Sequence, residues 1–473
     1  MTGLATLGLA MSARAASAQH AGVSGIWTGV LVAGQSRLRL RLVLAADGSA
    51  TLFSLDQGSS AIPGKAVAAT PDNLEIEIPA IGGRFTGKLA AADQIVGVWR
   101  QGGTDLPLTF LRGEAGLPKD AGLPVALPAP APLTPELLEQ LRQTSGSPAL
   151  GAAAQRRGGQ ILAWASGLRR LGAADKIGRE DRWHLGSITK SMTATLVGRL
   201  IEAGQLNWDD TVEALLGDMA PDMRPEYRAA TLRHLASHRS GLPGNIPTEQ
   251  LLQFSRENAD LRDERIAYAR LALAMPPRGP MGKTFEYSNS GYVVLGVIIE
   301  RRLGKSWEAT IGERLFEPLK LSSAGFGAPD RAGAAQPSGH AAGPDGALRA
   351  FPASGPISDN PAVIGPAGRV HMTLQDLITY LAAHRDQAPL LTPATWKTLH
   401  TPPFGGDYAM GWGVRPNGVL WHNGSNTLWC AMAAFHPSQG VASAAAANDG
   451  RVALVEPVVE RAVQDGFLAA RAE

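Results

Sequence analysis

The chain has 473 residues, of which 44% are hydrophobic and 18% charged, and its formal net charge is +2 at pH 7. This composition is typical of a globular protein with room for two or three domains, and it excludes a largely disordered chain. The near-neutral charge balance argues against a nucleic-acid-binding protein, which would carry a strong basic excess.

Residues 1–18 have features of an export signal. Leu4 to Met11 form a small apolar stretch, and Ala16-Ser17-Ala18 fits a small-x-small cleavage site before Gln19. A basic first region is missing, so an alanine-rich tail remains the alternative. We expect a periplasmic or secreted protein. No later run reaches 18 apolar residues, so no membrane span is expected.

Residues 22–113 predict a small antiparallel β-domain. Leucines alternate with arginines from Arg37 to Leu44, with Val43 as the exception, and Asp47-Gly48 is typical of a hairpin turn. Further strands are expected at 50–55, 74–78, 84–89, 95–100 and 106–111. Short turns at regular spacing indicate seven or eight strands in a barrel or a sandwich.

Residues 114–133 are rich in proline and predict an extended linker. The stretch 134–473 is mixed. Helices are expected at 134–143, 187–203, 263–275, 292–303 and 451–470. Strands are expected at 149–155, 160–166, 409–414, 418–422, 429–436 and 441–447. Strands near both ends of this stretch indicate one antiparallel sheet flanked by helices, with a helical region between its two halves.

The most informative segment contains Ser187 and Lys190, spaced three residues apart at the start of an expected helix. This spacing places both side chains on one helical face. The first turn of a helix also supplies unpaired N–H groups. A hydroxyl, an amine and N–H donors together are what a serine nucleophile needs. Alone, the pair favours an ordinary capped helix start with a surface lysine.

Tyr287 and Asn289 lie in a second segment, on a turn just before another expected helix. A lysine ammonium beside Tyr287 is expected to lower the proton affinity of its phenol, which then acts as acid and base. The amide of Asn289 can hold a substrate carbonyl or orient the lysine. The alternative is a capping turn with packed aromatic rings.

The third segment holds His422, Gly424 and Ser425 at the end of an expected strand. Gly424 lets a substrate approach the backbone closely, and the N–H of Ser425 is a candidate second oxyanion donor. His422 can donate to a carboxylate or carbonyl, or shuttle a proton. A β-turn with a surface histidine is the alternative.

These three segments, in this order, resemble the motifs of the penicillin-recognising serine hydrolases: Ser-x-x-Lys, Tyr-x-Asn and His-x-Gly. That family includes class C β-lactamases, D-alanyl-D-alanine carboxypeptidases, D-amino-acid peptidases and esterases of the same fold. Residues 235–242 are similar to a further family segment, Leu-Leu-Ser-His-x-Ser-Gly-Leu, and residues 365–368 and 373–377 also match. The resemblance covers residues 134–473 and implies a β-lactamase-like α+β fold there.

The resemblance also implies roles for the residues. Ser187 is the acylated nucleophile, and Lys190 and Tyr287 form the proton-transfer pair. Asn289 contacts the substrate or orients Lys190. The strand with His422 and Gly424 binds the acyl part, and the N–H groups of Ser187 and Ser425 form the oxyanion hole. No cofactor or metal is implied, and the expected partner is a small-molecule or peptide-like substrate.

Histidine at position 422 stands where many β-lactamases have lysine. A neutral histidine supplies less positive charge for the carboxylate of a β-lactam. The expected activity is therefore that of an esterase or D-amino-acid peptidase. A β-lactamase or penicillin-binding protein, and a catalytically weak binding protein of the cell envelope, remain the alternatives.

Two other patterns contain residue types that can carry chemistry. His234 and His238 have the spacing of zinc ligands on a helix, but Leu235 stands where a general-base glutamate would be needed and no third ligand is apparent. The single cysteine, Cys430, lies in an apolar run that favours a buried structural role. No Gly-x-Ser-x-Gly segment supports an α/β-hydrolase elbow.

Overall fold

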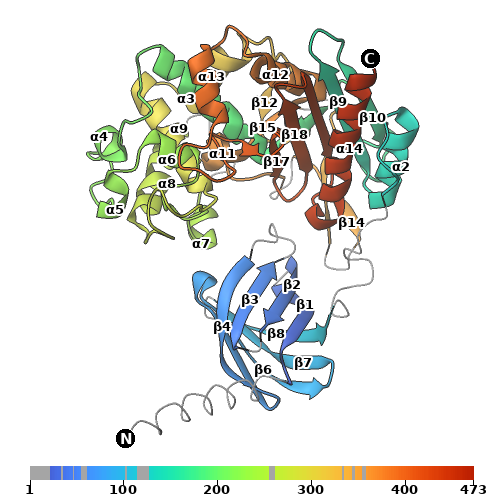
Figure 1. Ribbon diagram of the computed structural model, residues 1–473, viewed down its shortest axis with the longest axis vertical. Helices are drawn as coiled ribbons and strands as arrows, with labels where there is room; N and C mark the ends of the chain where they lie inside the picture. The colour runs from blue at the N-terminus through green and yellow to red at the C-terminus, as the bar shows by residue number, and fades with distance from the viewer. Residues whose placement is uncertain are drawn as a thin grey trace, which may run out of the picture. The chain divides into compact units, whose positions relative to one another are not determined.

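A computed structural model describes residues 22–33, 36–45, 47–54, 61–101, 104–113, 127–254, 261–332, 335–343, 347–353 and 358–473 (Figure 1). The chain divides into two compact units, one made of residues 1–124 and 343–347 and the other of residues 125–342 and 348–473. The expected signal segment, 1–18, lies outside the described residues, and so do residues 114–126 of the expected linker.

The first unit is a closed barrel of eight antiparallel strands in chain order. The barrel closes because β1 pairs with β8 as well as with β2. The expected all-β domain is confirmed, and of the two architectures left open it is the barrel. The strands are β1 (Gly25–Ala33), β2 (Ser36–Leu44), β3 (Ser49–Ser54), β4 (Ala61–Thr70), β5 (Asn73–Ile78), β6 (Gly83–Ala91), β7 (Gln94–Gln101) and β8 (Thr104–Arg112).

Along β3 and β5, for example, every second side chain is buried, and such side chains fill the barrel interior. Trp27, Phe85 and Trp99 are buried there, and the rings of Phe85 and Phe110 meet edge to face at 5.2 Å. Strand β4 was not expected as a separate strand, because Pro63 and Gly64 interrupt its pattern.

A six-stranded antiparallel sheet forms the centre of the second unit. Its order is β10 (Leu162–Gly167), β9 (Ala149–Arg156), β19 (Val441–Ala447), β18 (Cys430–His436), β17 (Leu420–Ser425) and β16 (Gly413–Val414). The pairing of Leu150 with Ala447 joins the two ends of this unit, as expected. Only the last two residues of the expected strand 409–414 pair, because the residues before them form a bend.

Helices cover both faces of this sheet (Figure 1). The helices α2 (Pro135–Ser145) and α14 (Val452–Ala472) pack on one face, and α12 (Leu374–Asp386) packs on the other. Many strand residues are alanines, such as Ala444 to Ala447, and their small side chains let the helices approach closely.

The helical region lies between the two halves of the sheet in sequence. Its helices are α3 (Thr189–Glu202), α4 (Val212–Leu216), α5 (Pro225–Arg228), α6 (Leu232–Ala236), α7 (Thr248–Leu251), α8 (Arg262–Ala274), α9 (Asn289–Leu303), α10 (Trp307–Ile311), α11 (Gly365–Gly368) and α13 (Pro393–His400). Two small sheets complete the unit: β11 (Arg182–His184) with β15 (Val370–Thr373) and β12 (Gly325–Phe326), and β13 (Gly339–Ala342) with β14 (Leu348–Phe351).

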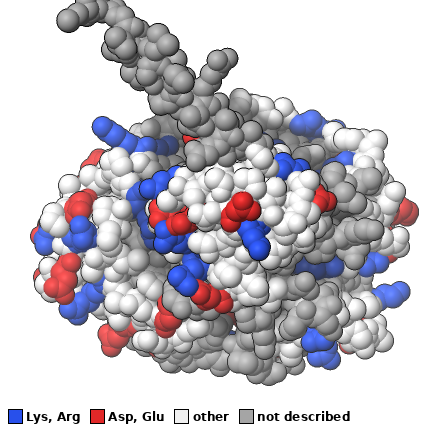
Figure 2. All heavy atoms as spheres, turned by 90° about the horizontal axis from the view of Figure 1, so that it is seen from below, with Lys and Arg blue, Asp and Glu red and all other residues white. Residues whose placement is uncertain are grey.

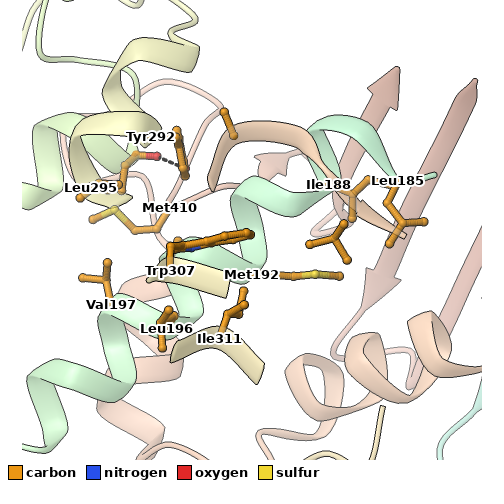
Figure 3. Close-up of a cluster of buried hydrophobic side chains, with 14 of the residues drawn as sticks. Leu185, Ile188, Met192, Leu196, Val197, Tyr292, Leu295, Trp307, Ile311 and Met410 are labelled. Atoms are coloured by element: carbon orange, nitrogen blue, oxygen red, sulfur yellow. Dashed lines mark hydrogen bonds between the residues drawn. The ribbon is translucent and has the colours of Figure 1, made fainter. Parts of the chain in front are cut away.

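Helix α3 is anchored in the largest apolar core of the molecule. Met192, Leu196 and Val197 point into a cluster that contains Trp307 and Ile311 (Figure 3). A helix buried on this scale cannot shift without opening cavities, so the residues at its start are held in place.

Acidic and basic side chains lie intermingled on the face that Figure 2 shows, in keeping with the small net charge. None of the helices in the described residues is both long and apolar enough to span a bilayer.

Candidate active site

The structure brings Ser187 and Lys190 together at the start of α3. Ser187 lies in a single 3₁₀ turn, η2 (Gly186–Ile188), that leads directly into the helix. The Lys190 Nζ is 2.9 Å from the Ser187 Oγ. Ser187 is half-buried, whereas Lys190 is fully buried, so the lysine reaches the serine from inside the protein.

Lys190 has two further partners, and both can only accept hydrogen bonds. Its Nζ lies 2.7 Å from the Asn289 Oδ1 and 2.8 Å from the Ala367 carbonyl oxygen. The Asn289 amide is oriented this way because its Nδ2 donates to the Asn245 Oδ1. A neutral amine has two N–H groups and one lone pair. The two oxygens take the N–H groups, and the lone pair therefore faces the Ser187 hydroxyl.

Burial lowers the pKa of Lys190 well below its ordinary value. The cause is desolvation of the ammonium, because the hydrogen-bond partners of Lys190 in the described part of the chain are uncharged. The geometry and the pKa agree on an amine that can accept the proton of Ser187.

Tyr287 lies over this pair. Its ring centroid is 4.8 Å from the Lys190 Nζ. Burial raises the pKa of Tyr287, and its hydrogen bond to Ser187 only partly opposes the rise. The residue as a whole is 38% exposed, but the phenol oxygen that titrates is the desolvated part.

The raised pKa of Tyr287 is the opposite of the expected lowering. That expectation assumed a lysine ammonium beside the phenol, whereas burial favours the neutral form of both groups. At neutral pH, Tyr287 is therefore a proton donor.

The N–H groups of Ser187 and Ser425, the two expected oxyanion donors, lie where η2 packs against β17. Gly186 has φ +49°, and a Cβ there would clash with the nitrogen of Ser425. A Cβ at Gly424 would lie 2.8 Å from the nitrogen of Ser187 and would clash with the Leu185 carbonyl. Glycine is thus required on both sides of the contact that brings these two N–H groups together.

His422 is buried beside the site and is already engaged on both ring nitrogens. Its Nδ1 lies against the Asn423 carbonyl, which only accepts, so Nδ1 carries the proton. Its Nε2 therefore accepts from the Tyr408 hydroxyl at 2.9 Å. Burial lowers the pKa of His422 to about 3, and Lys190 contributes to the lowering. In this arrangement His422 is neutral and offers no N–H to a substrate.

Two residues beside Tyr287 were not assigned to the site from the sequence. The His238 ring lies 4.4 Å from that of Tyr287 and 4.8 Å from that of Tyr408, and its Nδ1 accepts the Ser288 N–H at 3.0 Å. In the sequence, His238 has only the spacing of a zinc ligand and a place in the segment 235–242. Tyr408 has no motif around it and gave no signal.

The zinc pattern is not assembled. The Nδ1 of His234 bonds to Thr231, and its ring stacks on Phe404. His238 faces the tyrosines instead. Among the residues that the structure describes, no group of three or more His, Cys, Asp or Glu side chains is arranged to hold a metal ion.

Comparisons with known proteins give a consistent result. A family model described as Beta-lactamase matches residues 135–464. Penicillin-binding protein 4 of Amycolatopsis lactamdurans is 31% identical over 229 residues, which are 48% of this chain and 57% of that protein. The chain thus spans little more than half the length of this relative.

Solved structures share the fold. The octameric penicillin-binding protein homologue from Pyrococcus abyssi is 24% identical with a TM-score of 0.57, over 67% of this chain and 73% of that one. The D-amino acid amidase from Ochrobactrum anthropi SV3 is 20% identical with a TM-score of 0.57, over 71% of this chain and 98% of that one. The β-lactamase-like fold expected for the second unit is confirmed.

Proposed function

The chain belongs to the Beta-lactamase family, and from this premise we propose that it is a serine hydrolase that cleaves an ester or amide through an acyl-enzyme on Ser187. One observation carries the proposal. The Lys190 Nζ lies 2.9 Å from the Ser187 Oγ, and its other two partners, the Asn289 Oδ1 and the Ala367 carbonyl oxygen, can only accept. In its neutral form Lys190 can therefore take the proton of Ser187.

In the proposed acylation step, the Ser187 Oγ bonds to the substrate carbonyl carbon and its proton passes to Lys190. The N–H groups of Ser187 and Ser425 hold the oxygen that becomes negative. Tyr287, which is protonated, donates its proton to the leaving group and regains one from Lys190. The bond from the carbonyl carbon to the leaving group then breaks.

Deacylation reverses the same transfers with water as the nucleophile. The water oxygen bonds to the acyl carbon, one water proton passes to Lys190, and the Ser187 Oγ leaves and regains a proton. The acid product then departs. Each group returns to its starting state, so no cofactor is required.

The proposed substrate is an ester or a D-amino-acid amide in preference to a β-lactam. His422 occupies the position where a fixed cation would recognise a β-lactam carboxylate, and it is neutral. A D-amino acid amidase has the same fold, so the fold can accommodate an amide substrate. β-Lactam hydrolysis or penicillin binding is the second candidate, favoured by the 31% identical penicillin-binding relative.

The decisive experiment compares Ser187→Ala with the wild type on a short-chain nitrophenyl ester, a D-amino-acid amide and a penicillin. We expect Ser187→Ala to abolish turnover of whichever substrate is cleaved. Ser443→Ala is the matched control, because Ser443 is fully buried among the alanines of β19 and its replacement should fit. Equal turnover in Ser187→Ala and the wild type would overturn the proposal.

We also propose that residues 1–18 direct export and that residues 114–133 link the two units. The small residues Ala16-Ser17-Ala18 and the prolines of the linker support these assignments. Mass spectrometry of protein recovered outside the cytoplasm should find Gln19 as the first residue. Recovery of the full-length chain in the cytoplasm alone would contradict the export proposal.

A further inference from the structure

Beneath the proposed oxyanion hole lies a buried carboxylate that the mechanism above does not use. Asp359 is 5% exposed. Its Oδ1 accepts from the Asn360 N–H at 2.7 Å and the Asn426 Nδ2 at 2.9 Å, and it lies 3.0 Å from the His184 Nε2. Its Oδ2 lies 3.2 Å from the Nε of Arg369. The partners come from three segments that are far apart in the sequence.

The first of these segments carries the nucleophile. The His184 Nδ1 accepts the Gly186 N–H at 3.1 Å. With Nδ1 as the acceptor, the proton of the ring sits on Nε2, which faces Asp359. The bond at Gly186 fixes the peptide on one side of a residue with φ +49°. The orientation of the next N–H group, that of Ser187, follows from it.

The second segment carries the other oxyanion donor. Asn426 directly follows Ser425 and is buried. Its Nδ2 donates to Asp359, and its Oδ1 accepts the Leu428 N–H at 3.2 Å. The chain reverses here through Thr427, which has φ +71°. The hydrogen bond from the Asn426 side chain thus links the turn after Ser425 to Asp359.

The third segment carries the carbonyl that orients Lys190. Arg369 comes two residues after Ala367, whose carbonyl accepts from the Lys190 Nζ. The neighbouring Val370 N–H donates to Thr189 at the start of α3. Arg369 bridges this segment to the second oxygen of Asp359.

We propose that Asp359 is a positioning residue that sets the relative placement of the Ser187 and Ser425 N–H groups, acting through His184 and Asn426. The inference rests on the proposed function, because it concerns how the same site stabilises its oxyanion. An oxyanion hole works only when both donors are held at the separation that the transition state requires.

The charge state of Asp359 is consistent with this role. Burial raises the pKa of its carboxyl, but His184, Arg369 and Asn426 together hold the pKa below its ordinary value. The carboxylate is therefore ionised at neutral pH. It accepts hydrogen bonds from Asn360, Asn426 and Arg369 and lies 3.0 Å from the His184 Nε2 as an electrostatic contact. An amide in its place would offer one acceptor oxygen instead of two, so some of these donors would lose their partner.

The test is Asp359→Asn, assayed by kcat, by KM and by the affinity for phenylboronic acid. Boron bonds to the Ser187 Oγ and becomes a tetrahedral anion, so its affinity reports on the oxyanion donors. We expect kcat to fall about tenfold to a hundredfold with KM within about threefold, and boronate affinity to fall in parallel.

Asp465→Asn is the matched control. Asp465 is a fully buried carboxylate in α14, paired with Arg461 at 2.8 Å on the opposite face of the sheet from α12. It should lose stability while keeping kcat and boronate affinity. If Asp359→Asn does not fold, Asn426→Ala tests the link to the Ser425 segment alone and should lower kcat and boronate affinity in the same direction.

Wild-type kcat and boronate affinity in Asp359→Asn, or in a folded Asn426→Ala, would overturn the inference while leaving Ser187-dependent hydrolysis intact. An equal fall in Asp465→Asn would also overturn it, because the effect would then be a general one of lost stability. Absence of both turnover and boronate binding in the wild type would instead overturn the proposed function, and the inference with it.

Discussion

The two units of this chain have very different interiors. Among the described residues of the barrel, the buried side chains are apolar apart from Thr28 and Ser54. The interior of the second unit also contains Lys190, His238 and Asp359. Burying an ionisable group costs several kcal/mol unless partners compensate. The second unit therefore gives up stability to bury ionisable groups around the proposed site, and the described part of the barrel does not.

Burial of a charge is not enough to identify a site. Arg265 is as deeply buried as Lys190, but it pairs with two carboxylates, Glu300 and Glu308, and so joins α8, α9 and α10. Lys190 is surrounded by a hydroxyl, an amide oxygen and a carbonyl oxygen. A cation paired with carboxylates stays charged, whereas an amine among neutral oxygens becomes a base.

The largest effect that tests this contrast is on turnover. Lys190→Ala and Tyr287→Phe should each lower kcat by about a hundredfold or more, because each removes one group of the proposed proton transfer. Tyr227→Phe is the matched control, since its hydroxyl is also bonded, at 3.0 Å to the Met275 carbonyl, but within the core. Losses below threefold for both site variants would place the proton transfer on other residues.

The next largest effect is a loss of stability of the second unit at acidic pH. Burial lowers the pKa of His422 to about 3 and those of His371 and His400 to about 4. Their unfolded pKa is near 6.5. As the pH falls below 6.5, these histidines bind protons in the unfolded chain but stay neutral in the folded one, so the free energy of unfolding falls. At pH 5 each of these histidines should cost about 2 kcal/mol.

The barrel provides an internal control for this pH effect, because residues 22–113 contain no histidine. Hydrogen exchange followed by mass spectrometry at pH 7 and pH 5, corrected for intrinsic rates, should show loss of protection in the second unit alone. His371→Asn keeps a donor for the Gly327 carbonyl and should remove one histidine's share of the effect. Equal loss of protection in both units would contradict this assignment.

The smallest expected effect on turnover comes from the barrel. Phe85→Ala should destabilise that unit by about 3–5 kcal/mol, because a large buried ring is lost. The kcat of the second unit should stay unchanged, as measured with the same ester. A fall in kcat that follows the unfolding of the barrel would show that the barrel takes part in the site.

Local patterns predicted most strands of the barrel and the strands of the large sheet, but not helices α12 and α13 or the short strands β11 to β15. Pairing between distant segments limited what the patterns could predict. Alternating leucines indicated β2, but barrel and sandwich share that alternation. The choice between them depends on the pairing of β1 with β8, at opposite ends of the unit. Strand β19 was expected with the bounds that the structure has, because its apolar run ends at turn residues on both sides.

For the candidate site too, local contacts could be predicted and contacts between distant segments could not. Ser187 and Lys190 were identifiable because three residues of helix suffice to bring them together. The hydrogen bond between His422 and Tyr408 could not be predicted, because Tyr408 comes from another segment that contains no motif. Asp359 also lies in a stretch without a motif, and only the folded chain shows its partners to converge. The direction of the Tyr287 pKa depended on burial, which spacing does not report.

The strand order of the large sheet has a consequence for biosynthesis. The ribosome releases β9 long before its neighbour β19, and the Ser425 N–H also belongs to the late portion. A nascent chain that already displays Ser187 and Lys190 thus lacks both the finished sheet and the second donor. The proposed hydrolase activity would therefore arise only after β17 and β19 have been synthesised, whereas the barrel is free to fold first.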